Sequence, residues 1–153
     1  MSRTDRASLL IHAEKGRVFA ALTSPEALVQ FLPPKGMRGR FERFDMREGC
    51  SYRLVLTYDD ASGAPGKTSV DSDVTEVRIT RLVPGERIVQ EVDFETDDPA
   101  FSGTMRMEWS LQSGSEGTTV EFEARDVPEG IRARDHAEGL TSTLSNLAAL
   151  LEE

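Results

Sequence analysis

The segment "DHAEGLTSTLSNLAALLEE", residues 135–153, decides the fold of this chain. Apolar residues recur in it at spacings of three and four, which predicts an amphipathic helix with one continuous apolar face. That face consists of Ala137, Leu140, Leu144, Leu147 and Leu151. Asp135 followed by Glu138 resembles a capping box, so we expect the helix to begin there, or earlier near Ile131. The remaining face is polar but uncharged, which indicates that something covers part of it.

A glycine interrupts this helical pattern at position 139. Glycine in a helix interior costs about 1 kcal/mol relative to alanine, so its presence calls for a reason. We prefer close packing of Gly139 against neighbouring short helices. The alternative is that the missing side chain lets a ligand approach the backbone.

Alternating segments supply the surface on which the helix can lie. "SYRLVLTY", residues 51–58, and "TMRMEWSLQ", residues 104–112, each place apolar side chains on one face, and Arg106 and Glu108 point the other way. Residues 38–46, 73–83, 87–95 and 118–126 also have strand patterns, while residues 59–69 are expected to form a loop. Short turns between such strands predict an antiparallel sheet with one solvated face and one face covered by the C-terminal helix.

The N-terminal third adds a strand and two short helices. Residues 7–11 form a short apolar strand, and residues 14–23 have helical spacing. Ser24 is a suitable N-cap and Pro25 a suitable first residue for a second helix, which the Pro33–Pro34 pair ends. We therefore expect an α+β fold, with two short helices between the first two strands, in a single domain spanning residues 1–153.

Several stretches resemble a known family. "IHAEKGRVFAALTSPEALVQFLPP" (residues 11–34), "DMREGCSYRLVL" (residues 45–56) and "HAEGLTSTLSNLAALLEE" (residues 136–153) resemble the START-like SRPBCC superfamily, in the branch named for activator of heat-shock-protein-90 ATPase homologues. Cys50 replaces a glycine of the family pattern, and Leu140 replaces a tryptophan. The resemblance implies a helix-grip fold, in which a curved antiparallel sheet wraps around the long C-terminal helix and encloses an apolar cavity. It implies no particular activity.

A cavity of that kind would have mostly apolar walls with a few polar groups. The residues expected to line it are Phe31, Tyr52, Leu54, Tyr58, Met107, Trp109, Phe122, His136, Leu140 and Leu144. For His136 we prefer a local hydrogen bond at the start of the helix, with a role as base or ligand contact at the cavity mouth as the alternative. The other histidine, His12, is expected to be exposed or locally satisfied. No metal-ligand cluster and no cofactor motif is apparent.

The composition of the chain argues against two classes of function, nucleic-acid binding and membrane spanning. The net charge of −9 argues against nucleic-acid binding, and no apolar run is long enough to span a membrane. The absence of a secretory signal and the presence of one cysteine indicate the cytoplasm. We expect binding of a small apolar or amphipathic molecule, with no catalytic residue assigned. The alternatives are a cyclase- or hydrolase-like enzyme using a histidine or tyrosine in the cavity, a co-chaperone or stress-response interaction protein, and homodimerisation through the uncharged helix face.

Overall fold

A curved seven-stranded sheet dominates the described part of the chain. The computed structural model describes residues 3–33, 36–58, 72–94, 98–101 and 103–152, so the loop expected over residues 59–69 lies outside the described residues. All neighbouring strands are antiparallel, in the order β1-β7-β6-β5-β4-β3-β2. The strands are β1 (Thr4–Ile11), β2 (Met37–Phe44), β3 (Ser51–Tyr58), β4 (Ser72–Val83), β5 (Arg87–Phe94), β6 (Thr104–Gly114) and β7 (Gly117–Arg125).

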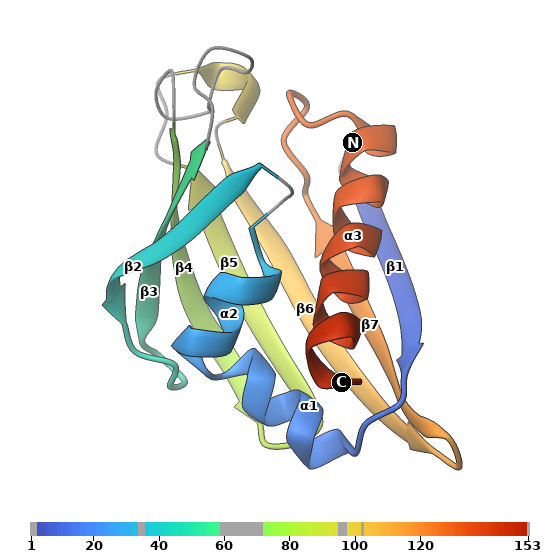
Figure 1. Cartoon of the computed structure of the whole chain (residues 1–153). Coiled ribbons are helices and arrows are strands. Elements are labelled where there is room, and N and C mark those ends of the chain that lie inside the picture. Colours follow the sequence, from blue (N-terminus) through green and yellow to red (C-terminus); the bar gives the residue numbers. More distant parts are fainter. Residues whose placement is uncertain (1–2, 34–35, 59–71, 95–97, 102, 153) are drawn as a thin grey trace.

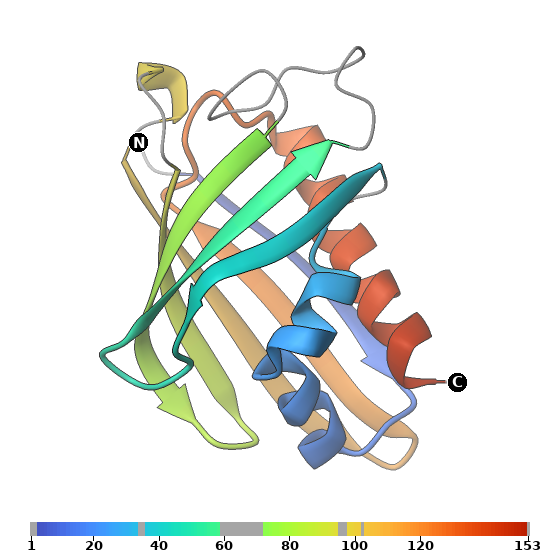
Figure 2. The same ribbon diagram turned by 60° about the vertical axis from the view of Figure 1, so that its left-hand side comes forward.

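The helices lie on the concave side of this sheet (Figures 1 and 2). Helices α1 (Lys15–Leu22) and α2 (Pro25–Phe31) connect β1 to β2, and α3 (Ala133–Leu151) ends the fold; a short 3-10 helix, η1 (Pro99–Phe101), precedes β6. Ser24 caps α2 as predicted, since its hydroxyl accepts a hydrogen bond from the Ala27 amide at 3.3 Å. The expected α+β helix-grip architecture is confirmed.

Helix α3 covers only one part of the sheet. It contacts β1, β7 and α2, and Figure 1 shows it running over the β1–β7 side. Its buried face consists of Leu140, Leu144, Leu147, Ala148 and Leu151. Ala137, which was expected in this apolar face, is exposed instead. The first turns of α3 therefore extend beyond the packed core, and the concave side of the central strands is not covered by this helix.

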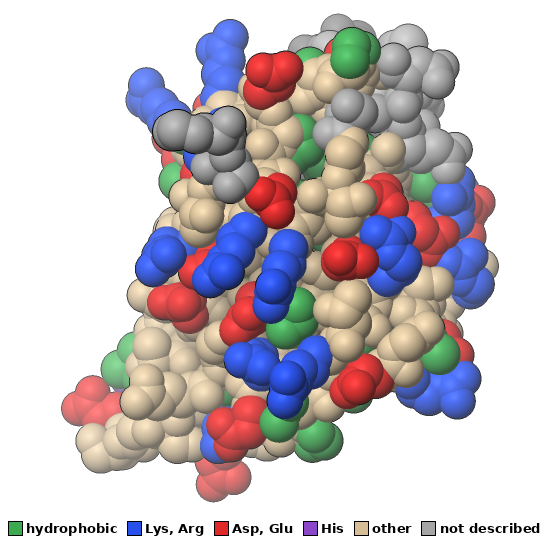
Figure 3. Space-filling model, turned by 180° about the vertical axis from the view of Figure 1, so that it is seen from behind, with side chains coloured by type: hydrophobic (Ala, Val, Ile, Leu, Met, Phe, Trp, Pro, Cys, Tyr) green, Lys and Arg blue, Asp and Glu red, His purple; other side chains and the backbone are tan. Residues whose placement is uncertain are grey.

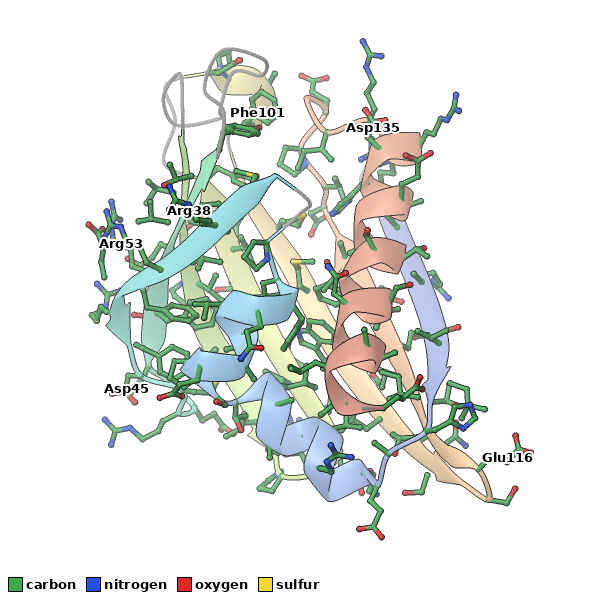
Figure 4. The ribbon with its side chains drawn as sticks, viewed as in Figure 1. Arg38, Asp45, Arg53, Phe101, Glu116 and Asp135 are labelled. Atoms are coloured by element: carbon green, nitrogen blue, oxygen red, sulfur yellow. The ribbon has the colours of Figure 1, made fainter. Side chains whose placement is uncertain are left out.

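The start of α3 differs from the capping box predicted at Asp135. The helix begins at Ala133, and its N-cap residue, Arg132, makes no capping hydrogen bond through its side chain. Asp135 lies within the first turn at the N-terminal end, where Figure 4 shows it, and Glu138 pairs with Arg134 at 3.7 Å. The helix dipole stabilises a carboxylate in the first turn even when that carboxylate makes no capping hydrogen bond. Asp135 therefore suits the start of this helix without being its N-cap.

The convex face of the sheet carries interspersed positive and negative side chains (Figure 3). Arg106 and Glu108 lie on this face as predicted, 3.7 Å apart. Glu108 also lies 3.7 Å from Arg87 on the neighbouring strand, and its side chain is only 21% exposed. Long arginine side chains therefore cover part of this face, which is less solvated than the alternation alone suggested.

Candidate functional site: a cavity beside the C-terminal helix

A cavity of about 230 Å³ lies between the concave sheet face, α2 and the first half of α3. It arises because α3 lies over β1 and β7, so that the inward side chains of β3 to β6 have open space above them. Its walls are mainly apolar. Of the described residues that line it, none is lysine, arginine, aspartate or glutamate. This composition suits an apolar or amphipathic occupant of small size.

The structure brings most of the expected lining residues together. Those that line the cavity are Tyr52, Leu54, Met107, Trp109, Phe122, His136 and Leu140. Three others do not line it. Phe31 is fully buried, and its ring is nearly perpendicular to that of Trp109 at a centroid distance of 6.3 Å. Leu144 is buried in the core one turn further along α3, and Tyr58 lies half-buried at the end of β3, opposite Met37.

A stacked aromatic pair forms one wall. Trp109 on β6 lies directly opposite Phe122 on β7, and their rings are 3.6 Å apart at an interplanar angle of 11°. Cross-strand aromatic pairs of this kind stabilise a sheet beyond the area they bury. Phe31 also packs against Trp109, so the indole contacts an aromatic ring on each of two elements, β7 and α2.

A second aromatic group orients Tyr52. The register of β2 shifts between Phe41 and Arg43, so that Phe41 and Phe44 both pack against Tyr52 although three positions separate them. Such a bulge adds a residue and turns the following side chain toward the other face. The Tyr52 ring is 5.2 Å from Phe41 and 5.6 Å from Phe44. Its hydroxyl is thereby directed toward β5, where it accepts a hydrogen bond from Gln90 Nε2 at 3.4 Å.

Two further polar residues lie in this apolar wall. Gln90 is 4% exposed and Thr75 is 9% exposed, and both line the cavity. Sequence analysis did not assign either to the site. The signal was present for Gln90, which alternates with Ile88 and Val92 and therefore had to face inward. Burial raises the pKa of Tyr52, and the Gln90 hydrogen bond offsets this only in part, so Tyr52 stays a neutral phenol.

His136 takes part in a polar cluster at the α3 end of the cavity. Its Nδ1 lies 2.8 Å from Asp5 Oδ2, and the Asp5 side chain is 8% exposed. Arg3 donates to the same carboxylate oxygen at 3.1 Å and to the Ile131 carbonyl at 2.5 Å. Since a carboxylate only accepts, His136 Nδ1 carries the proton, and Nε2 is the nitrogen that can act as a base. This hydrogen bond differs from the local one expected, because its partner lies 131 positions away.

Asp5 was missed because the first strand was predicted too short. The strand begins at Thr4 rather than residue 7, and the alternation of Ala7, Leu9 and Ile11 extends back to Asp5. Asp5 therefore belongs to the inward face, where a carboxylate needs partners. Extending the period-2 pattern by one step would have found it.

Gly139 lies at the edge of the cavity and is exposed. A Cβ added at this position would meet no atom within 4 Å, so no neighbouring helix packs on it. The preferred interpretation, tight packing against the short helices, is therefore wrong. The absent side chain instead widens the space at the cavity edge.

His12 is exposed, as expected, and lies away from the cavity. Its Nδ1 is 3.1 Å from the Glu116 carbonyl oxygen, and Figure 4 shows Glu116 at the tip of the β6–β7 hairpin. Among the described side chains, no group of three histidine, cysteine or acidic residues is arranged to hold a metal ion. No helix in the described ranges is long and apolar enough to cross a membrane.

Comparisons with known proteins agree with this geometry. The curved sheet, the C-terminal helix and the cavity between them define the helix-grip class. A family model described as activator of Hsp90 ATPase homolog 1-like protein matches residues 12–152, and the chain belongs to this family within the START-like SRPBCC superfamily. Among proteins with curated descriptions, none matches the chain.

Solved structures share the fold over almost the whole chain. Protein CV1439 from Chromobacterium violaceum is 30% identical, with a TM-score of 0.86, covering 98% of this chain and 97% of the other. Protein MLL2253 from Mesorhizobium loti is 20% identical, with a TM-score of 0.74 and coverage of 98% and 97%. An AHSA1-like protein from Aeromonas hydrophila is 14% identical, with a TM-score of 0.75 and coverage of 98% and 92%.

Proposed function

We propose that this protein binds a small apolar or amphipathic molecule in the cavity between the sheet and α3. The observation that carries the proposal is the cavity itself, about 230 Å³ in volume and free of lysine, arginine, aspartate and glutamate among its described lining residues. An apolar cavity of about 150 Å³ already accommodates benzene. Drug-sized ligands occupy about 300–1,000 Å³, so the expected ligand is smaller than these.

Native mass spectrometry of freshly purified protein tests this proposal. We expect a co-purified small molecule, lost when Val92, an inward residue of β5 that lines the cavity, is replaced by phenylalanine. Thr57→Val, on the convex side of β3 and away from the cavity, is the control and should leave binding intact. A bound molecule that persists unchanged in the Val92→Phe variant would show that it occupies another place.

A second candidate function, general-base catalysis, is favoured by the Asp5–His136 pair. The carboxylate fixes the tautomer of His136, which lines the cavity, so Nε2 is suited to accept a proton. In ester hydrolysis, Nε2 would take a proton from water while the water oxygen bonds to the acyl carbon. The ester C–O bond then breaks, and the imidazolium returns its proton to the departing oxygen. His136 would be the base, and Asp5 a positioning residue.

Release of 4-nitrophenolate from 4-nitrophenyl butyrate tests this candidate. If the pair is catalytic, His136→Gln abolishes the protein-dependent rate, and Asp5→Asn lowers it and alters its pH profile because the tautomer is no longer fixed. Thr57→Val, on the convex side of β3, serves as the control. Equal rates for wild type and the three variants would reject general-base catalysis by this pair and would not affect the proposed binding function.

A further inference from the structure

Among the described sheet residues that line the cavity, the polar ones lie close together on β3, β4 and β5. They are Tyr52, Thr75 and Gln90, which we call the polar triad. They surround Val77: Tyr52 is paired directly with Val77 across β3 and β4, and Thr75 lies two residues earlier on β4. Gln90 lies two residues before Val92, the β5 partner of Val77. Such positions are about 5–8 Å apart, within reach of one ligand group and its neighbours.

The triad has unused hydrogen-bonding capacity. Within the described part of the chain, the Thr75 side chain makes no hydrogen bond, although it is only 9% exposed. No fully enclosed polar side-chain atom among the described residues lacks a partner, so the Thr75 hydroxyl must reach the cavity that it lines. The one hydrogen bond between Gln90 and Tyr52 is long, at 3.4 Å.

From this arrangement, and building on the proposed binding function, we infer that the cavity selects an uncharged ligand bearing a hydroxyl or carbonyl oxygen, which lies against the polar triad. Hydroxyl and carboxamide groups together offer donors and acceptors to such an oxygen. A carboxylate or an ammonium group would lose its hydration beside apolar walls, and the polar triad carries no counter-charge. The rest of the ligand would contact the apolar surfaces of Leu54, Met107 and Trp109.

The single tryptophan of the chain provides the readout, since Trp109 lines the cavity. Three matched probes that do not absorb with tryptophan are 4-methylcyclohexanol, methylcyclohexane and 4-methylcyclohexanecarboxylate. In titrations followed by Trp109 fluorescence, we expect the alcohol to bind at least as tightly as the more hydrophobic hydrocarbon. The carboxylate should bind at least about ten-fold more weakly than the alcohol.

Thr75→Val is the decisive variant because it removes a hydroxyl that makes no hydrogen bond within the described part of the chain. We expect it to weaken alcohol binding about three- to ten-fold, to leave hydrocarbon binding equal or tighter, and to keep or raise the melting temperature. Tyr52→Phe should reduce the preference for the alcohol in the same direction. Thr57→Val, a matched substitution on the convex face, should change none of these values.

The outcomes separate this inference from the function on which it rests. If the hydrocarbon and the alcohol bind equally to wild type and to Thr75→Val, the cavity binds apolar molecules but the triad does not select the oxygen. Tighter binding of the carboxylate than of the alcohol overturns the inference in the same way. If none of the three probes affects Trp109, both the selectivity and the proposed binding function are rejected.

Discussion

At the scale of single residues, Asp5 stands out as a carboxylate on the apolar side of a strand. Its position is tolerated because Arg3 and His136 both approach the same oxygen, at 3.1 and 2.8 Å. The cluster ties the start of β1 to the first turns of α3 and, through the Ile131 carbonyl, to the segment before α3. Removal of its central acceptor should therefore loosen three parts of the chain together.

Asp5→Ala should lower the free energy of unfolding by about 1–3 kcal/mol, because it leaves two partly buried donors without their shared acceptor. Asp5→Asn should lower the free energy of unfolding by less, since asparagine retains the shape of the side chain and one acceptor oxygen. Urea unfolding monitored by circular dichroism at neutral pH measures both. Equal stability of wild type and Asp5→Ala would mean that water replaces the carboxylate at no cost.

At the scale of elements, Gly139 weakens α3 without serving the packing of the protein. Alanine fits there with no atom within 4 Å, so Gly139→Ala should stabilise the protein by about 1 kcal/mol through helix propensity alone. Thermal unfolding checks this expectation. A destabilised Gly139→Ala protein would reveal a steric conflict that the structure does not contain.

The limits of sequence-based prediction also appear at this scale. Leu140, Leu144 and Leu147 could be assigned to the buried face of α3 because each lies on a periodic pattern that continues in both directions. Ala137 belongs to the same pattern but is exposed, because the spacing shows which face is apolar and not how far the partner surface extends. The Asp5–His136 contact was inaccessible to local patterns, since it depends on how strand and helix meet.

For the cavity residues too, the sequence pattern predicts the face of each element but not which side chains reach the cavity. Trp109 and Phe122 could be assigned to one face by alternation, and they do share a wall. Phe31 was assigned to the wall but packs against Trp109 without lining the cavity, because a sequence cannot tell which of two packed aromatic rings is nearer to a cavity. Thr75 was missed because Val74 and Val77 lie on opposite faces of β4, so the alternation there does not assign Thr75 to the apolar face.

At the scale of the whole molecule, ion pairs cross the convex face from strand to strand. Arg78 on β4 lies 2.5 Å from Asp93 and 3.4 Å from Glu91, both on β5. Burial alone would raise the pKa of Asp93, but the hydrogen bonds from Arg78 and Thr104 outweigh it and lower that pKa from 3.8. The unfolded chain therefore takes up this proton first as the pH falls.

Stability that depends on Asp93 should thus be complete above its ordinary pKa of 3.8 and be lost as the pH falls through the lower value of the folded state. In urea unfolding, Asp93→Asn should be less stable than wild type at about pH 5, and the difference should shrink by about pH 2.5. Glu121→Gln, on the same face, is the control. A difference that does not vary with pH would rule out the ion pair as its origin.

The off-centre position of α3 has a consequence for its local opening. His136, Gly139, Leu140 and Thr143 in the first half of the helix line the cavity, whereas Leu144, Leu147 and Leu151 in the second half do not. A bound ligand would therefore contact both the central strands and the first half of α3. It would raise the free energy of local unfolding of that half of the helix. Amide hydrogen–deuterium exchange should slow on loading with 4-methylcyclohexanol across residues 136–143 and stay unchanged across residues 147–151. At saturating ligand, the two halves of this continuous helix would thus differ in their protection from amide exchange.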